Sequence, residues 1–366
     1  MERQINLSDG VSEGISLKDL TPTPENPIDL ARLERLRNLV GSGPVMILTH
    51  DSPDPDALAA GKALATLLNV SWSVPSRLFY SGLVARAENR AMLRLLTPEW
   101  ESVEVAPDAQ GFSAIALVDT QPEGGNNSLA DNYRPQIVFD HHRELRLRSR
   151  RIPYSDLRSE IGATSTLLYQ HLEAAGIIPD STLATAMFYG IQTDTRGLAR
   201  GASPVDGVVY LNLVALLDRQ KLVQVEQAGL SRQYFQAFYR GLQATRLYPH
   251  SVVAILSVMD RPDLPADLAD MLIRLEDCQA ALCMGVHHGT LYLSLRTIPE
   301  GKDAGPLAQQ AVGSLGKAGG HGSLAGGQVS LAGRDLRAVT QEIEGRFLRA
   351  MGESEPGEPL LPDEVA

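Results

Sequence analysis

Short apolar runs alternate with longer segments of helical pattern over the first half of the chain. The apolar runs are residues 44–50, 113–120 and 135–142. Runs of this length, bounded by turn-forming residues, are typical of strands buried in a parallel sheet. The helical segments are residues 28–40, 57–70, 162–176 and 181–194. Strands that alternate with helices in this way predict an α/β domain built on an open, mainly parallel sheet.

The pattern changes after about residue 218, where the sequence becomes helical and more charged. A second series of elements follows, with a strand at 251–258 and a hairpin whose turn lies at His288-Gly289. Asn-Gly-like dipeptides between alternating strands favour such turns. We therefore expect an α/β protein of two lobes, in which a helical linker joins the parallel domain to a smaller, mixed α/β domain. The expected division is an N-terminal extension (1–30), a first domain (31–217), a linker (218–247), a second domain (248–351) and a disordered acidic tail (352–366).

Composition and charge narrow the class of protein. Hydrophobic residues make up 43% of the chain, as in globular proteins, and no apolar run is long enough to span a bilayer. The first residues lack the apolar core of a secretory signal, and the two cysteines, Cys278 and Cys283, lack metal-site spacing. We therefore expect a cytoplasmic protein with no membrane partner. A net charge of −11 disfavours long duplex nucleic acid as a partner, whereas a small phosphorylated substrate stays compatible if bound cations dominate the local field.

Polar residues gather directly after the three predicted strands of the first domain. They are His50, Asp54 and Asp56 after the first strand, Asp119 after the second, and Asp140, His141 and His142 at the end of the third. In open α/β sheets the carboxyl ends of the strands form the edge where ligands bind. Asp194 follows a predicted helix, so its place in the same cluster is an assumption. The strand ends predict a shared polar site.

Each of these residues also has a simpler explanation. Asp54 and Asp56, next to prolines, could build a turn, and Asp119 or Asp194 could cap or end a helix. Taken together, however, so many carboxylates on one edge would repel each other unless cations lay among them. Carboxylates mixed with imidazoles suit manganese or a similar divalent cation. The donors are sufficient for two ions that share a carboxylate.

Four short segments, in this order and spacing, resemble the motifs of a known family. They are "HDSPDPDALAAG", "VDT", "DHH" and "QTD", and they are similar to the four motifs of the DHH-family phosphoesterases, the RecJ-like superfamily. Further on, "SLGKAGGHGSLAGG" is similar to the GGGH-type motif of the DHH-associated domain, and "YLSLRT" to its strand with an arginine. Ala318 stands where that motif usually has its first glycine, which matters only if the position needs a positive φ. The resemblance is greatest to the stand-alone nanoRNase/pAp-phosphatase and di-adenylate phosphodiesterase group.

The resemblance implies a set of site residues. One Mn²⁺ ion would be held by His50, Asp54 and Asp119, and a second by Asp56, Asp119, His141 and Asp194, with Mg²⁺ or Co²⁺ as substitutes. Of the other two motif residues, Asp140 would orient an imidazole, and His142 would contact the scissile phosphate or assist the leaving group.

The second domain would supply the substrate-binding residues. Gly319 and Gly320 would let backbone N–H groups approach a phosphate closely, and His321 would reach the same phosphate as part of the catalytic machinery. Arg296 would grip a terminal phosphate, although a solvent-exposed strand arginine explains this residue equally well.

The function that the resemblance implies is that of a metal-dependent phosphoesterase. It would hydrolyse short oligonucleotides (nanoRNA and linear dinucleotides) and/or pAp with water activated by two metals. One alternative is a cyclic di-AMP phosphodiesterase. Another is a non-catalytic, nucleotide-binding regulator on the same scaffold, against which the complete set of ligands argues. Because members of the family often dimerise, a homodimer is the expected assembly.

Overall fold

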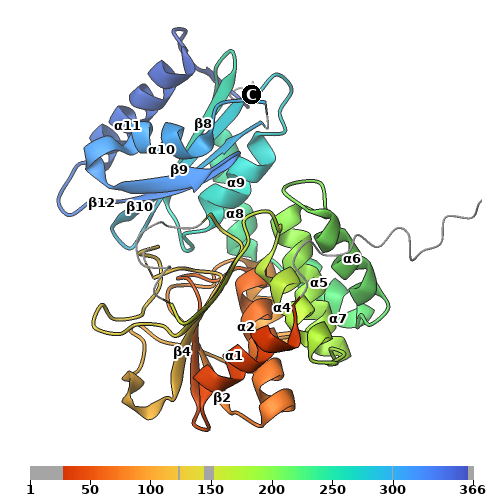
Figure 1. Ribbon diagram of the computed structural model, residues 1–366. Helices are drawn as coiled ribbons and strands as arrows, with labels where there is room; N and C mark the ends of the chain where they lie inside the picture. Colours follow the sequence, from red (N-terminus) through yellow and green to blue (C-terminus); the bar gives the residue numbers. More distant parts are fainter. Residues whose placement is uncertain (1–27, 123, 144–151, 299, 362–366) are drawn as a thin grey trace, which may run out of the picture. The chain divides into compact units, whose positions relative to one another are not determined.

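The computed structural model describes residues 28–122, 124–143, 152–298 and 300–361 (Figure 1). Two compact units divide the chain between Ala228 and Gly229, inside the stretch that we interpreted as a linker. The expectation for residues 1–27 lies outside the described residues. Within the described ranges, none of the helices combines the length and the apolarity that crossing a membrane requires.

A six-stranded sheet forms the centre of the first unit. In spatial order its strands are β3 (Trp100–Ser102), β2 (Ser76–Tyr80), β1 (Val45–Leu48), β4 (Ala114–Val118), β5 (Ile137–Asp140) and β6 (Tyr154–Leu157). Every neighbouring pair is parallel. The chain runs outward from β1 through β2 to β3, and then returns to place β4 on the other side of β1. The carboxyl ends of β1 and β4 therefore form the point of reversed strand order, where open α/β sheets bind ligands.

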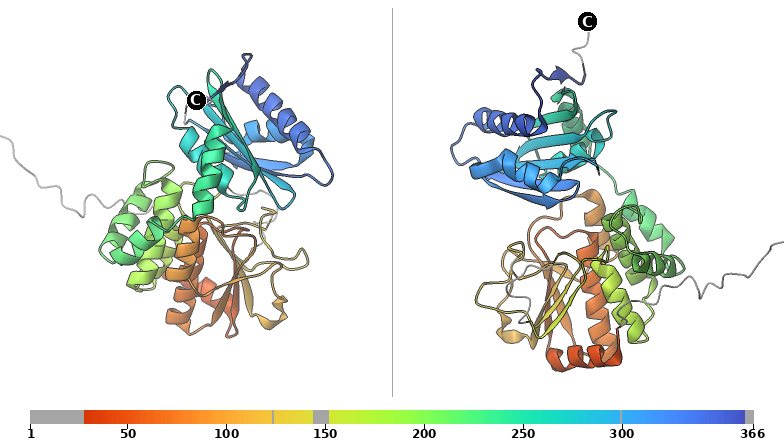
Figure 2. Two further views of the ribbon diagram at one scale, coloured as in Figure 1. Left: turned by 180° about the vertical axis from the view of Figure 1, so that it is seen from behind. Right: turned by 45° about the horizontal axis from the view of Figure 1, so that its top comes forward.

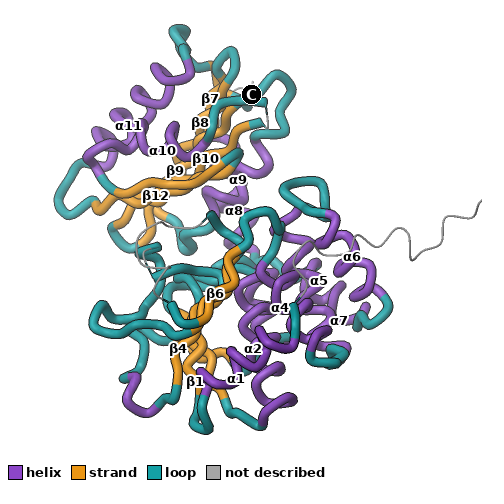
Figure 3. The backbone as a smooth tube through the Cα atoms, in the orientation of Figure 1, coloured by secondary structure: helices purple, strands orange, loops and turns teal. Residues whose placement is uncertain are grey.

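Helices and loops cover opposite faces of this sheet. The helices are α1 (Leu30–Val40), α2 (Pro55–Trp72), α3 (Ala87–Leu95), α4 (Thr164–Ala174), α5 (Ser181–Thr195), α6 (Pro204–Val214) and α7 (Arg219–Glu226). On one face, Ile47 of β1 packs in a core with Leu64 of α2 and Leu167 of α4. On the other face, Met46 packs in a second core with residues such as Phe112. Figure 3 shows loops on one side of this sheet and helices on the other. The two cores fix β1 and α2, the elements that carry the first polar residues.

The second unit is built on a seven-stranded, mixed sheet. In spatial order its strands are β11 (Lys317–His321), β12 (Leu324–Ser330), β10 (Thr290–Thr297), β9 (Ala280–His287), β8 (Ser251–Val258), β7 (Thr245–Leu247) and β13 (Glu358–Pro359). Only β8 and β9 pair in parallel. Helices α10 (Ala304–Val312) and α11 (Leu336–Met351) cover one face, and α8 (Arg232–Gln243) and α9 (Leu264–Leu272) the other (Figure 2).

The predicted fold class is confirmed, with a parallel sheet in the first unit and a mixed sheet in the second. The glycine-rich stretch forms the β11–β12 hairpin, a pairing that glycine's low strand propensity hides in the sequence. Ala318 has no positive φ, so alanine fits this position. Gly320 differs, because its φ is 155° and a Cβ there would lie 2.2 Å from the carbonyl oxygen of Leu324.

The end of the chain differs from its prediction. We expected a disordered tail over 352–366, but β13 pairs with β7, and the N–H of Leu360 donates to the carbonyl of Thr245 at 3.0 Å. Gly357 packs against the ring of Tyr248, where a Cβ would lie 2.6 Å from the nearest ring atom. An acidic, Pro-rich segment has no apolar pattern that would reveal such edge pairing. Residues 362–366 lie outside the described residues.

Candidate metal centre

Six of the predicted ligands lie together at the carboxyl edge of the first sheet. His50 and Asp119 follow β1 and β4, Asp54 and Asp56 begin α2, His141 follows β5, and Asp194 lies in the last turn of α5. Two groups, His50 with Asp54 and Asp119, and Asp56 with His141 and Asp194, each place one potential ligand atom per residue within 4.8 Å of the others. A third group, of Asp119, His141 and His142, links the two. The sequence prediction of a shared site thus corresponds to one place in the fold.

His50 and His141 turn the same ring nitrogen toward the cluster. The Nδ1 of His50 lies 3.0 Å from the carbonyl oxygen of the next residue, and the Nδ1 of His141 lies 3.2 Å from that of Ile161. An Nδ1–H that donates to a carbonyl leaves the lone pair on Nε2, the form in which imidazole binds metals. The Nε2 of His141 lies 3.2 Å from Asp194 Oδ2, and the Nε2 of His50 lies 3.5 Å from Asp119 Oδ2. Both rings are oriented as metal ligands would be.

Asp119 lies at the centre of the cluster in an unusual conformation. Its φ is 59°, a left-handed value that costs a non-glycine residue energy and that clusters at functional sites. The carboxylate is buried, and Oδ1 accepts a hydrogen bond from the Thr164 hydroxyl at 2.8 Å. Within the described residues, Asp119 Oδ2 and His141 Nε2 are both buried without a hydrogen-bond partner. Because buried polar atoms are almost always satisfied, this pair fits a site that binds a cation.

Asp56 joins two helices to the cluster. Its carboxylate accepts hydrogen bonds from the backbone N–H groups of Thr164, at 2.6 Å, and Ser165, at 2.9 Å. The N-cap residue of α4, Ala163, offers no side-chain acceptor, so Asp56 caps α4 from a distance. A Cβ on Gly190 of α5 would lie 3.0 Å from the Cα of Asp56. A glycine there lets α5, and with it Asp194, approach α2.

The charges of the cluster are not balanced by the protein alone. Burial and the neighbouring carboxylates raise the pKa of Asp56 well above its usual value and that of Asp194 to about 6. Burial lowers the pKa of His141, but the ion pair with Asp194 and the other nearby carboxylates raise it to about 11. Burial also opposes ionisation of Asp119, yet three imidazoles hold its pKa well below the usual range. Protons therefore occupy positions that a divalent cation would take over on binding.

Asp140 orients His142, and not the predicted ligand His141. Its Oδ1 lies 2.8 Å from Nδ1 of His142 and accepts the backbone N–H of the same residue at 3.1 Å. The other oxygen accepts a hydrogen bond from Nε2 of Gln121 at 2.7 Å. Sequence reasoning missed Gln121, since a glutamine three residues after a strand carries no signature of this contact. The His142 side chain is 44% exposed and lies at the rim of the cluster.

The second unit places the predicted substrate-binding residues on β10 and β11. Arg296 is buried, and its guanidinium donates to Asp270 at 2.5 Å and to the Ser294 hydroxyl at 2.7 Å. The alternative of a solvent-exposed arginine is therefore wrong. Gly319 has open space where a Cβ would stand. His321 ends β11, and its side chain lies outside the described part of the structure.

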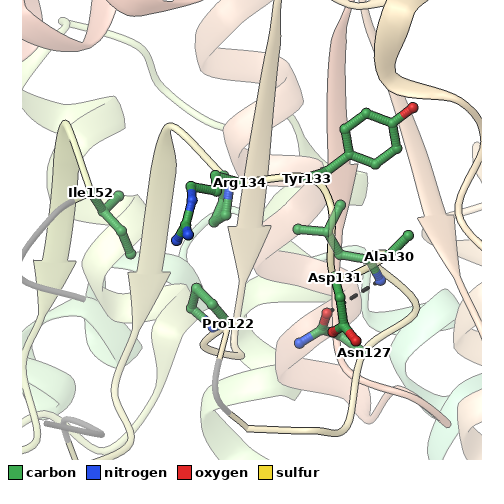
Figure 4. Close-up of a pocket in the computed structure, with 9 residues that line it drawn as sticks. Pro122, Asn127, Ala130, Asp131, Tyr133, Arg134 and Ile152 are labelled. Atoms are coloured by element: carbon green, nitrogen blue, oxygen red, sulfur yellow. Dashed lines mark hydrogen bonds between the residues drawn. The ribbon is translucent and has the colours of Figure 1, made fainter. Parts of the chain in front are cut away.

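A small pocket lies among loop residues of the first unit (Figure 4). It is lined by Pro122, Asn127, Leu129, Ala130, Asp131, Tyr133, Arg134, Pro135 and Ile152. Its volume is about 60 Å³, whereas sites for drug-sized ligands span about 300–1,000 Å³. It contains none of the predicted site residues.

Parts of this chain are similar in sequence to known proteins. An uncharacterized protein of Methanocaldococcus jannaschii is 30% identical over 318 residues, which cover 84% of this chain and 64% of the relative. A probable manganese-dependent inorganic pyrophosphatase of Streptococcus agalactiae is 23% identical over 186 residues, covering 51% of this chain and 58% of the relative. The chain thus spans less than two thirds of the length of either relative.

Solved structures and a family model complete the comparison. The crystal structure of an exopolyphosphatase-related protein from Bacteroides fragilis superimposes with a TM-score of 0.69 at 14% identity, over 88% of this chain and 97% of that chain, and so has the same fold. Residues 44–191 match the family model described as DHH family, N-terminal domain. Every predicted ligand except Asp194 lies within this match. Residues 44–191 of this chain are therefore similar to the N-terminal domain of the DHH family.

Proposed function

We propose that the chain is a metal-dependent phosphoesterase that hydrolyses short oligonucleotides (nanoRNA and linear dinucleotides) and/or pAp. The observation that carries the proposal is the pair of ligand groups that adjoin at Asp119, where Oδ2 is buried without a hydrogen-bond partner among the described residues. The similarity of residues 44–191 to the DHH family N-terminal domain supports it. Similarity to a probable manganese-dependent inorganic pyrophosphatase supports manganese and the cleavage of phosphorus–oxygen bonds.

Two Mn²⁺ ions are the proposed cofactor, with Mg²⁺ or Co²⁺ as substitutes. His50, Asp54 and Asp119 would hold one ion, and Asp56, His141 and Asp194 would hold the other, with Asp119 between them. Paired divalent cations lower the pKa of water and stabilise the charge that develops during phosphoryl displacement. The nitrogen and oxygen donors here match the preference of Mn²⁺.

His142 is the proposed proton donor to the leaving group. Burial lowers its pKa, but the hydrogen bond from its ring to Asp140 raises the value to about 9. A protonated imidazole in this place would supply the proton for the oxygen that leaves phosphorus. Asp140, held in turn by Gln121, fixes the direction of the ring.

Arg296, Gly319, Gly320 and His321 are the proposed substrate-binding residues of the second unit. The guanidinium of Arg296 is held by Asp270 and Ser294, so its orientation is set before a substrate arrives. Replacing Arg296 with alanine should raise KM more than it lowers kcat if the group holds a phosphate away from the scissile bond. An unchanged KM would remove Arg296 from the proposal.

The first test is a turnover panel with Mn²⁺, comparing pAp, linear pApA, a five-nucleotide RNA, cyclic di-AMP and inorganic pyrophosphate at equal concentration. We expect pAp and the short linear substrates to be hydrolysed fastest. The Asp119→Ala protein, purified in the same way, controls for contaminating phosphatases. Fastest hydrolysis of cyclic di-AMP would instead assign the protein to second-messenger turnover.

Two other outcomes would contradict the proposed substrate class. Fastest hydrolysis of pyrophosphate would place the activity with that of the similar streptococcal protein. Nucleotide binding without turnover of any substrate, in Mn²⁺-loaded protein, would favour a regulator. Size measurements in solution test the proposed homodimer separately.

A further inference from the structure

Asp206 is a buried carboxylate that the predicted site does not include. It lies in the first turn of α6 and is fully buried, without an ion-pair partner among the described residues. Its Oδ2 accepts hydrogen bonds from the N–H of Gly162 at 2.8 Å, and from the N–H and hydroxyl of Ser203 at 2.7 and 2.6 Å. Its Oδ1 accepts from the Thr166 hydroxyl at 2.6 Å. Four donors offset the cost of burying this group.

Helix capping explains only part of this arrangement. Ser203 and Asp206 form a capping box at the start of α6, a local device that needs no distant partner. Gly162 and Thr166, in contrast, are 44 and 40 residues away along the chain. The carboxylate therefore ties the start of α6 to the segment of residues 161–166, which leads into α4.

The segment 161–166 holds three of the predicted metal ligands in place. Its contacts are the carbonyl of Ile161 with Nδ1 of His141, the N–H groups of Thr164 and Ser165 with Asp56, and the hydroxyl of Thr164 with Asp119. These ligands come from both ligand groups of the metal centre. A shift of this one segment would move the contacts of both.

The segment also has little room to move. A Cβ on Gly162 would lie 2.7 Å from the Thr195 side chain and 3.0 Å from the carbonyl oxygen of Gly201. Thr195 ends α5 and directly follows Asp194. The bond between Gly162 and Asp206 thus holds the segment against the helix end that carries a further ligand.

We propose that Asp206 is a positioning residue of the metal centre, which sets the affinity for divalent cations through residues 161–166 without binding the cation itself. This inference rests on the proposed function only in requiring that the centre bind a divalent cation.

Isothermal titration of the metal-free, full-length chain with MnCl₂, in the absence of substrate, tests the inference. Partners that orient metal ligands typically contribute about 10–100-fold to affinity, so we expect Asp206→Ala to raise the Kd for Mn²⁺ about 10-fold. Asp218→Ala is the matched control. It removes the cap of α7, where Asp218 accepts the N–H of Lys221, and should leave the Kd within about twofold because Asp218 has no described contact with residues 161–166.

Two further variants separate positioning from simple loss of fold. Asp206→Asn can still accept from Gly162 and Ser203 through its oxygen, and can donate to the Thr166 hydroxyl, so it should restore a Kd near that of the wild type. Thr166→Val, of similar size, removes one bond to Asp206, and we expect about a threefold rise in Kd. If Asp206→Ala does not fold, the Kd of Thr166→Val for Mn²⁺ tests the inference in its place.

Three outcomes would overturn the inference. The first is a Kd for folded Asp206→Ala within twofold of the wild type. The second is a Kd for Asp206→Asn as high as that for Asp206→Ala, and the third is an unchanged Kd for Thr166→Val. If the wild type binds Mn²⁺, any of these results for a variant leaves the proposed function standing. Absence of Mn²⁺ binding by the wild type would overturn both.

Discussion

The chain contains two pairs of adjacent histidines in opposite settings. The rings of His141 and His142 lie 4.4 Å apart at the end of β5, and both approach Asp119. The rings of His287 and His288 lie 4.1 Å apart at the β9–β10 hairpin, where the described residues form no group of potential metal ligands. The two pairs are alike as dipeptides. At the end of β5 the neighbouring strand ends supply carboxylates, whereas at the β9–β10 turn His287 meets the carbonyl oxygen of Met259, which follows β8.

Among the variants that test this comparison, Asp119→Ala should have the largest effect on activity. We expect Asp119→Ala to lower kcat/KM for the preferred substrate by at least about 1,000-fold, roughly 4 kcal/mol, because both ligand groups adjoin at this carboxylate. The fold should persist although alanine is strained at the left-handed φ of 59°, and circular dichroism of the variant can check this. Substantial residual activity would contradict the shared role of Asp119.

Replacing one histidine of each pair should show that the two pairs differ in their effect on Mn²⁺ affinity. We expect His141→Ala to raise the Kd for Mn²⁺ by at least about 100-fold, above the effect of losing an orienting partner. His287→Ala should leave the Kd unchanged, because the partner of its Nδ1 among the described residues is the carbonyl oxygen of Met259, at 3.0 Å. Titration calorimetry measures both. Similar losses in the two variants would show that the strand-end setting is not what distinguishes the pairs.

His171 provides a third setting, in the core of the first unit. Burial lowers its pKa to about 4, and the ring contacts the Tyr154 hydroxyl and the carbonyl of Leu167. Since the unfolded chain has the higher pKa, about 6.5, it binds the extra proton, and stability falls as the pH drops from about 6.5 towards 4. Between pH 7 and pH 5 this loss should be about 2 kcal/mol.

Urea unfolding of the wild type and of His171→Gln at both pH values checks this prediction. The variant should lose less stability on acidification, because it lacks the titrating ring. Parallel losses in the two proteins would mean that His171 is protonated in the folded state.

The smallest effect concerns the hairpin pair. His288 and Gly289 have φ values of 46° and 74°, the conformation of a turn that asparagine followed by glycine adopts most readily. We expect His288→Asn to increase the free energy of unfolding by about 0.5 kcal/mol and to leave Mn²⁺ affinity unchanged. A fall in Mn²⁺ affinity would give this pair a role that its surroundings do not indicate.

The sequence was most informative where local patterns decide the structure. His50, Asp119 and His141 could be placed together because each follows an apolar run, and parallel strands share an edge. Asp194 could not be placed in this way, since its position depends on packing between α5 and α2 at Gly190. Asp206 was missed because it acts on a segment far away along the chain, although the Ser-Pro pattern before it signals a helix start.

The spread of the ligands along the chain has a consequence for when the cation can bind. Each ligand group combines residues from distant segments, and the second group is complete only when Asp194 of α5 has joined Asp56 of α2. Contacts so far apart in sequence form late, because closing long loops costs entropy. During synthesis, the emerging chain therefore lacks a cation site until the first unit has closed. A metal that binds only the closed unit slows its reopening and does not guide its formation.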